Sequence, residues 1–506
     1  MAIERGTFDI VITGGRVIDP ETNLDGVRNV GIKDGKIAAV TEKAIEGKET
    51  IDAKGHVVAP GFIDMHNHNT GVPFGEKMAL RDGVTTPMEL EGGVYPVEDW
   101  YASVKGKCRA NYGASVGTAP VREHIFNPKY KTPKQAGFLF LYDMMSPPED
   151  SDFTMQWSTQ IATPEQIRQL ESMLEEGLQH GAIGVGHGPG YMEFACTNEE
   201  SVIAQKMAGK YGQSTFLHGR FSSQMPPASG LLSFLEMMAP QEVYGGGLVC
   251  QHLSAQALSG TMTALELIDK ARERGIHILG ELYPYNFGGT IAGADYLKPD
   301  NYQRNMGRDY KDIIEVATMK PLTKERYEEL TSKTPGASVM FANAKYEDVY
   351  KGLAHPTSVL GSDAYPYVIR ETGKIAIDFD IPYGTVNGHP RSSGAHAKLL
   401  QWVREKKIDI PLSLAVSKMT YMIAQYLEDN GVPQMAEKGR IQEGKDADIT
   451  IFDPDTVKEN ATIDDAGLPS TGIPYVLVNG TVVVKDSEVL KGVFPGEPIY
   501  GSGKAS

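Results

Sequence analysis

Short apolar segments alternate with amphipathic helical segments through the middle of the chain, from about residue 59 to residue 430. Continuous apolar runs are typical of buried strands, whereas an apolar residue at every third or fourth position is typical of a helix. Their alternation predicts parallel strands joined by crossover helices. Strands are predicted near Phe62–His66, Thr85–Glu91, Tyr112–Val116, Ile183–Val185, Ser214–His218, Leu248–His252, Ile278–Tyr283 and Ser358–Asp363. Eight such strands predict a (β/α)8 barrel, the TIM-barrel fold of the α/β class.

The helices predicted between these strands include Thr163–His180, Ser201–Tyr211, Thr261–Arg274 and Ala395–Lys406. Residues 284–356 are too many for a connecting loop between two elements. We expect them to form an insertion over the mouth of the barrel.

The two ends of the chain have a different pattern, in which apolar and polar residues alternate in short runs. The sequences KDGK at residues 33–36 and NG at residues 479–480 are typical hairpin turns. Because isolated hairpins are marginal in water, we expect both ends to combine into one small β-sandwich domain. The predicted domains are a first β part at 1–58, the barrel at 59–430, and a second β part with the C-terminal tail at 431–506.

The charge and cysteine content of the chain limit the kinds of binding partner that we expect. The net charge of −16 argues against nucleic acid or an anionic membrane, although a small anionic substrate feels only the local field of its pocket. Cys108, Cys196 and Cys250 are far apart and odd in number, so no disulfide framework is predicted. The sequence shows neither a signal peptide nor a run of about 18 apolar residues. We therefore expect a cytoplasmic protein with a small-molecule substrate, and the sequence leaves a homo-oligomer open.

The first predicted barrel strand runs into two histidines. The segment VVAPGFIDMHNHN, Val57–Asn69, contains His66 and His68 with one residue between them. Residues two apart in a strand share a face, so these imidazoles would project together. Two converging imidazoles predict a site for a divalent metal ion.

Further polar residues end other predicted strands. His218 ends STFLH, His252 ends GLVCQH and Asp363 ends SVLGSD. In a TIM barrel the chemistry lies at the carboxyl ends of the strands, so we expect these residues to meet the histidine pair. A bound zinc ion lowers the pKa of its water to about 7. Asp363 could take a proton from that water and deliver it to a leaving nitrogen.

The second predicted strand, GVTTPMELEGG, supplies a candidate to bridge two cations. Two ions about 3.5–4 Å apart need a shared anionic ligand. Glu89 and Glu91 differ by two, so both could face the barrel interior. Glu91 lies nearer the strand end and is the favoured bridge, with Glu89 as the alternative.

Several of these motifs together carry a family resemblance. They are APGFIDMHNH with the histidine pair, LHGR on strand five, QHLS on strand six, GSDA on strand eight, and the later ELYPYNFGGT and HPRSSG. With them the sequence resembles the metal-dependent amidohydrolase superfamily, and more narrowly its N-acyl-D-amino-acid deacylase (D-aminoacylase) branch. The resemblance implies a metal-dependent hydrolase with one or two divalent ions per chain, zinc being the expected ion.

The resemblance also implies roles for individual residues. The positions that match metal ligands are His66 and His68 for one ion and His218 and His252 for the other, and Asp363 matches the general acid/base. The positions that match contacts to the substrate carboxylate or amide are Arg220, Tyr283 and Arg391. A guanidinium group suits a carboxylate because it can donate two parallel hydrogen bonds.

The chain departs from the branch at the bridging position. D-aminoacylases carry a cysteine ligand shortly after GVTT, where this chain has ELEGG. Hydantoinases and dihydroorotases use a carboxylated lysine on strand four, but the corresponding GAIGVGHGPG has no lysine, so Glu91 is the predicted bridge. Ser254 stands where the branch often has a lysine, and Gly289 lies in GGT, which replaces a GST-like segment. Substrate preference is therefore expected to differ from that of ordinary D-aminoacylases.

These observations predict an enzyme that cleaves a C–N amide bond by metal-activated hydroxide. The expected substrate is an N-acyl amino acid, of the D series in the resembling branch, or a similar amide that carries a carboxylate. One alternative is a cyclic amide hydrolase of the hydantoinase, dihydroorotase or lactamase type. The other is a binding protein that retains the fold without activity.

Overall fold

The computed structural model describes residues 8–128, 154–226 and 228–504, and it contains the predicted barrel. Eight parallel strands pair in the order β17-β12-β11-β10-β9-β8-β7-β6. Their bounds are β6 Phe62–Asp64, β7 Val84–Val94, β8 Gly113–Gly117, β9 Val185–His187, β10 Ser214–Leu217, β11 Gly247–Cys250, β12 Ile278–Leu282 and β17 Val359–Leu360. The predicted TIM-like barrel is confirmed, and each predicted strand overlaps an observed one.

A buried aspartate joins the first and last strands of this sheet. Asp64 Oδ1 accepts a hydrogen bond from the Ser362 backbone N–H at 3.0 Å, and Asp64 Oδ2 accepts one from the Ser362 hydroxyl at 2.5 Å. Both carboxylate oxygens of a fully buried side chain are thereby satisfied, as burial of a charge requires. The barrel interior is filled by apolar side chains that include Met65, Met88 and Phe216.

Helices cover the barrel, and the predicted ones are present. Those that follow the strands are α1 Pro73–Arg81, α2 Val97–Val104, α3 Thr118–Phe126, α5 Gln156–Thr159, α6 Pro164–Gln179, α7 Asn198–Lys210, α8 Gly230–Tyr244, α9 Leu253–Ala257, α10 Thr261–Glu273, α14 Arg391–Arg404, α15 Leu412–Lys418 and α16 Tyr421–Asp429. The predicted start at Thr163 is a capping box, in which the Thr163 hydroxyl accepts from the Gln166 N–H and the Gln166 side chain accepts from the Thr163 N–H. None of the helices in the described part of the chain is long and apolar enough to cross a membrane.

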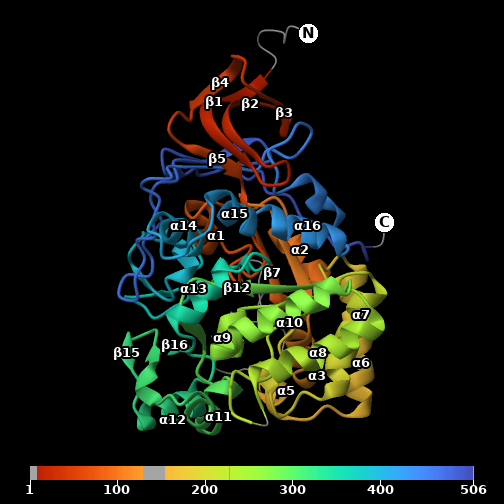
Figure 1. The fold of residues 1–506 in the computed structure, drawn as a ribbon. Helices are drawn as coiled ribbons and strands as arrows, with labels where there is room; N and C mark the ends of the chain where they lie inside the picture. The colour runs from red at the N-terminus through yellow and green to blue at the C-terminus, as the bar shows by residue number, and fades with distance from the viewer. Residues whose placement is uncertain (1–7, 129–153, 227, 505–506) are drawn as a thin grey trace.

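Strands from both ends of the chain form one nine-stranded sheet. Its order is β23-β22-β21-β20-β5-β1-β2-β3, with β4 paired to β1. The bounds are β1 Phe8–Asp19, β2 Leu24–Lys33, β3 Lys36–Thr41, β4 Gly47–Asp52, β5 Val57–Pro60, β20 Ile449–Phe452, β21 Tyr475–Val478, β22 Thr481–Lys485 and β23 Glu488–Val489. The ends of the chain meet where β20 pairs antiparallel with β5, directly before the first barrel strand. In Figure 1 the N-terminal strands lie at the top, with the C-terminal part of the chain beside β5.

The long insertion folds as a small unit of its own. A four-stranded antiparallel sheet has the order β13-β16-β14-β15. Its elements are β13 Phe287–Ile291, α11 Pro299–Met306, β14 Ile313–Glu315, β15 Lys320–Pro321, α12 Lys324–Lys333 and β16 Ser338–Ala342, with α13 Tyr346–Ala354 leading back to the barrel. In Figure 1 this unit lies at the end of the molecule opposite the N-terminal strands. A short pair, β18 Val368–Ile369 with β19 Val386–Asn387, follows the last barrel strand.

Candidate metal centre

The histidine pair lies directly beyond the end of β6, and both rings are buried. A carboxylate holds one nitrogen of each ring. His66 Nδ1 is 2.8 Å from Glu281 Oε2, and His68 Nδ1 is 2.9 Å from Glu89 Oε2. A carboxylate on Nδ1 fixes the tautomer that carries the proton there, so Nε2 keeps its lone pair for a metal ion. The two rings are thus oriented for metal binding.

Glu91 on β7 joins two groups of histidines. Its Oε2 atom is 3.4 Å from both His66 Nε2 and His68 Nε2. Its Oε1 atom is 2.9 Å from His218 Nδ1 and 2.7 Å from His252 Nε2. One carboxylate therefore faces both predicted ligand pairs, each with a different oxygen, which is the arrangement that a bridging ligand has.

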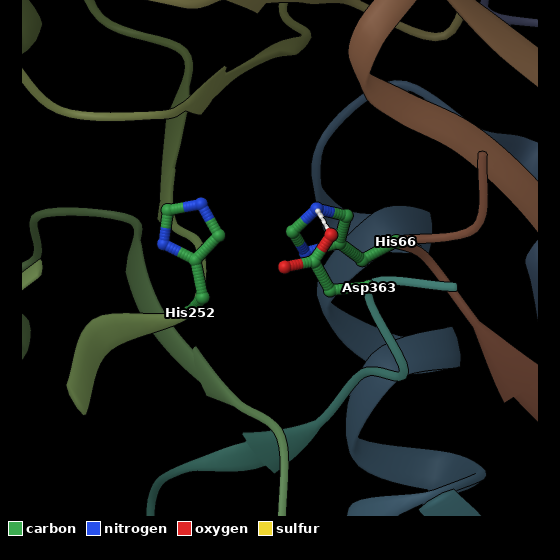
Figure 2. Close-up of side chains that lie close together, drawn as sticks. All are labelled: His66, His252 and Asp363. Atoms are coloured by element: carbon green, nitrogen blue, oxygen red, sulfur yellow. Dashed lines mark ion pairs between the residues drawn. The ribbon is translucent and has the colours of Figure 1, made fainter. Parts of the chain in front are cut away.

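Asp363 approaches the first group from the chain segment after β17, which lies beside the segment after β6. Figure 2 shows its carboxylate against the His66 ring, with His252 facing them, although the three residues follow three different strands. Asp363 Oδ1 is 3.3 Å from His66 Nε2 and 3.4 Å from His68 Nε2. The backbones of Asp363 and His252 both have positive φ, 51° and 35°. A non-glycine residue in this region is strained, and such strain is typical of functional sites.

Burial and charge act in opposite directions on the acids of this centre. Burial alone raises the pKa of Glu91, but the neighbouring imidazoles, first His66 and then His218 and His252, lower that pKa well below its ordinary value. Burial also raises the pKa of Asp363, and the guanidinium of Arg391 and the imidazole of His66 outweigh it, so this pKa is lowered as well. Both side chains are therefore carboxylates near neutral pH, and they favour positive charge between them.

The donor set fits divalent metal ions. The buried Nε2 atom of His66 has no hydrogen-bond partner among the described residues, although carboxylate oxygens lie on two sides of it. Three groups of residues bring one potential ligand atom each to within 4.8 Å of the others. They are His66, His68 and Glu91; Glu91, His218 and His252; and His66, His252 and Asp363. Imidazole nitrogen with carboxylate oxygen is a ligand set that zinc accepts.

A pocket adjoins this centre and contains two of the three predicted substrate contacts, Arg391 and Tyr283. Arg391 Nη1 is 2.8 Å from Asp363 Oδ2. The Arg391 guanidinium also lies over the ring of Tyr283, 4.9 Å from its centroid. The Tyr283 hydroxyl accepts a hydrogen bond at 2.8 Å from Asn343, directly after β16, and Phe341 of β16 lines the pocket, so the insertion contributes directly to it.

Arg220, the third predicted substrate contact, is directed to partners outside the pocket. Its Nη2 and Nε atoms donate to the two carboxylate oxygens of Glu236 on α8, at 2.8 and 3.1 Å. Its Nη1 atom donates to the carbonyl groups of Glu193 and Cys196 at 3.0 and 2.8 Å. The guanidinium thus fastens the loop after β9 to α8, and Arg220 does not line the pocket. Its contact with substrate stays a prediction.

Glu281 of β12 was not anticipated from the sequence. Besides His66 Nδ1, its Oε2 atom accepts the backbone N–H of His252 at 2.9 Å. One buried carboxylate therefore orients a predicted ligand of the first group and the backbone of a predicted ligand of the second. The available signal was an acidic residue inside an apolar strand, ILGEL. A carboxylate is not buried in such a strand without partners.

We expect Glu281→Gln to weaken metal binding by roughly 10- to 100-fold. This is the usual effect of replacing a residue that hydrogen-bonds to a metal ligand. The amide oxygen can still accept both hydrogen bonds, so the fold is kept while the charge behind His66 is lost. The measurement is metal content after dialysis against graded chelator concentrations. Glu123→Gln is the matched control, because Glu123 is also buried but contacts none of the ligands and burial raises its pKa to about 7. Equal metal retention in both variants would contradict the role of Glu281.

Comparison with known proteins finds a family model and two relatives of similar length. Residues 49–111 match the model of a family described as "Amidohydrolase family". The chain is 26% identical over 495 residues to N-acyl-D-glutamate deacylase of Alcaligenes xylosoxydans xylosoxydans, covering 94% of this chain and 93% of the relative. It is also 26% identical over 505 residues to D-aminoacylase of the same organism, covering 94% of each.

The fold is also similar to that of a solved deacylase. The N-acyl-D-glutamate deacylase of Bordetella bronchiseptica, in complex with zinc and a phosphonate inhibitor, superimposes with a TM-score of 0.75 at 23% identity. The match covers 98% of this chain and 100% of that one. The barrel, the terminal β-sheet and the insertion are therefore all within the matched region.

Proposed function

We propose that this chain, a member of the amidohydrolase superfamily in its D-aminoacylase-like branch, hydrolyses the amide bond of an N-acyl amino acid with the help of bound metal. The observation that carries the proposal is the position of Glu91, one carboxylate between two groups of imidazoles, beside a pocket that contains Asp363 and Arg391. A binding protein without activity would have no use for this combination.

The residues that would hold metal are His66 and His68 for one ion and His218 and His252 for a second, with Glu91 shared between them. Zinc bound by them would polarise the amide carbonyl and lower the pKa of water to about 7. We propose zinc because imidazole and carboxylate ligands suit it and because a relative of the same fold carries it.

Asp363 is the proposed general acid/base. Its low pKa makes it a carboxylate, so it can accept a proton from the water that attacks the carbonyl. The same carboxyl group then delivers that proton to the nitrogen of the departing amino acid. Arg391, 2.8 Å from Asp363, is close enough to bind the carboxylate of that amino acid and so to bring its nitrogen to the general acid.

Tyr283 is the proposed hydrogen-bond donor to the oxyanion that forms on the attacked carbonyl. Burial raises the pKa of its hydroxyl, so the group carries its proton at neutral pH. Because Asn343 donates to the Tyr283 oxygen, the proton of that hydroxyl is free to point to another acceptor. A donor of this kind lowers the barrier by stabilising charge that develops in the transition state.

Cyclic amide hydrolysis is the second candidate, and the strand-four position argues against it. β9 ends in His187, and no lysine lies on this strand to become carboxylated. The two near-full-length relatives described above are both named for deacylation. Only a substrate panel separates the two reactions.

The test combines metal analysis with that panel. We expect at least one ion per chain after gentle purification, and amine release from N-acetyl amino acids that stops with chelator and returns with zinc. The panel contains both enantiomers, together with a hydantoin and dihydroorotate. Turnover of the cyclic amides alone would replace the proposal with the second candidate. Less than one ion per chain and no turnover of any compound would instead indicate a binding protein.

A further inference from the structure

The pocket beside the metal centre has aromatic walls and little room. Its empty volume is about 320 Å³, with the part that is open to solvent included. Its apolar and small lining residues are Tyr191, Tyr296, Phe341, Ala255, Gly288 and Gly289. Tyr191 and Tyr296 pack against the His218 ring, with ring centroids at 4.5 and 5.3 Å.

Arg391 is the only lysine or arginine among the described residues that line this pocket. Two other buried arginines near the barrel mouth are already paired. Arg220 is held by Glu236, and Arg122 is held by Glu200 at 2.6 Å and by two carbonyl groups. Neither can turn to the pocket without leaving a buried glutamate unpaired, which is costly.

Four buried carboxylates lie at this centre: Glu91 and Asp363 face the Nε2 atoms of His66 and His68, and Glu281 and Glu89 lie behind these rings at their Nδ1 atoms. The four positive charges of two divalent ions would balance the four carboxylates, with no positive charge left over. Arg391, which pairs with Asp363 at 2.8 Å, would then give the site a net charge of one positive unit, which matches one substrate carboxylate. A second substrate carboxylate would be desolvated near Asp363 and Glu91 without a counter-charge.

From this we infer the substrate class within the proposed function, on which the inference rests. The substrate carries one carboxylate, and its side chain and acyl group are uncharged, so N-acyl derivatives of neutral amino acids are hydrolysed and those of aspartate and glutamate are excluded. Sequence identity does not decide this point, because the chain is 26% identical both to an N-acyl-D-glutamate deacylase and to a D-aminoacylase. The charges of the residues that line the pocket decide between neutral and acidic substrates.

The first test compares N-acetylglutamine with N-acetylglutamate in the zinc-loaded protein, in both enantiomers. These two compounds have nearly the same shape and differ in one charge. Burying a charge without a partner is costly, so we expect kcat/KM for the glutamine compound to be at least about 100-fold higher. N-acetylleucine should be hydrolysed at least as well as the glutamine compound. Turnover of glutamate and glutamine derivatives within threefold, or a preference for glutamate, would overturn the inference.

A charge added to the pocket tests whether charge is the cause of the discrimination between the two compounds. Ser222 is half-buried and lines the pocket, so Ser222→Lys adds a cation there. We expect this variant to reduce the glutamine-to-glutamate ratio at least tenfold. Gln224→Lys is the matched control, because Gln224 is exposed on the same loop outside the pocket, and its ratio should stay at the wild-type value. An unchanged ratio in Ser222→Lys would show that charge is not what discriminates.

Binding separates failure of the inference from failure of the proposed function. Zinc-loaded Asp363→Asn, which should bind substrate but turn it over at least about 100-fold more slowly, is titrated calorimetrically with the same compounds. Tighter binding of the glutamine compound supports the inference even if no compound is hydrolysed by the wild type. Binding of both compounds with equal affinity overturns the inference and leaves amide hydrolysis intact. Absence of binding by any N-acyl amino acid overturns both.

Discussion

Asp363→Asn should lower kcat by roughly 10²- to 10⁴-fold, the range that a positioned general acid/base contributes. Metal content should stay close to that of the wild type, because His66, His68 and Glu91 remain as ligands. Asparagine is the sharpest substitution here. The backbone of Asp363 has φ of 51°, a conformation that asparagine tolerates and alanine does not, so Asp363→Ala would add backbone strain to the loss of the carboxylate.

The measurement is kcat and KM of zinc-loaded protein on one N-acetyl amino acid, with metal content from the same preparation. Asp295→Asn is the matched control. Asp295 is a buried aspartate of the insertion, and its carboxylate pairs with Lys298 and the Glu193 backbone, not with a metal ligand. Asp363→Asn that keeps most of kcat with unchanged metal content would remove Asp363 from the proton transfers. A loss of metal in that variant would assign it a ligand role instead.

The barrel was predictable because parallel strands buried on both faces read as apolar runs, and such runs lie between amphipathic helices. The convergence of His66, His218, His252 and Asp363 was predictable for a related reason. The carboxyl ends of barrel strands meet at one face, so polar residues at those ends are brought together whatever their separation in the chain. Short β17, of two residues, was still recognisable from the run that contains it.

The directions of long side chains could not be obtained in this way. Arg220 lies two residues after His218, but its guanidinium bonds to Glu236 on the following helix, and no spacing in the sequence indicates that pairing. Glu281 is the converse case. Its charge is visible in the sequence, but its partner His66 is 215 residues away along the chain. Both depend on tertiary contacts, which a strand or helix pattern does not contain.

The two glutamates of β7 show most clearly what the sequence pattern could not predict. Glu89 and Glu91 share a face in the sequence pattern, yet the structure gives them different neighbours. Glu89 lies against the Nδ1 atom of His68, behind the ligand atoms, whereas Glu91 lies between both groups of imidazoles. The pairing of β7 with β8 is irregular between Glu89 and Val94, so the simple alternation of a regular strand does not extend through this part. The bridging role of Glu91 therefore stays a prediction that metal analysis has to test.

Glu91→Gln should remove at least one metal ion per chain and lower kcat/KM by more than 100-fold, because an amide cannot bridge two cations as a carboxylate does. Glu89→Gln should keep both ions at saturating zinc and only weaken their binding, by roughly 10- to 100-fold, because Glu89 contacts the Nδ1 atom of His68 and not the predicted ligand atom Nε2. The pair forms its own control, because both changes remove one buried charge from the same strand. Metal stoichiometry at several free zinc concentrations is the measurement. If Glu89→Gln loses the ion and Glu91→Gln retains it, the bridge moves to Glu89. If both variants keep two ions, the imidazoles hold the metal without a carboxylate bridge, and the charge balance that limits the substrate to one carboxylate has to be reconsidered.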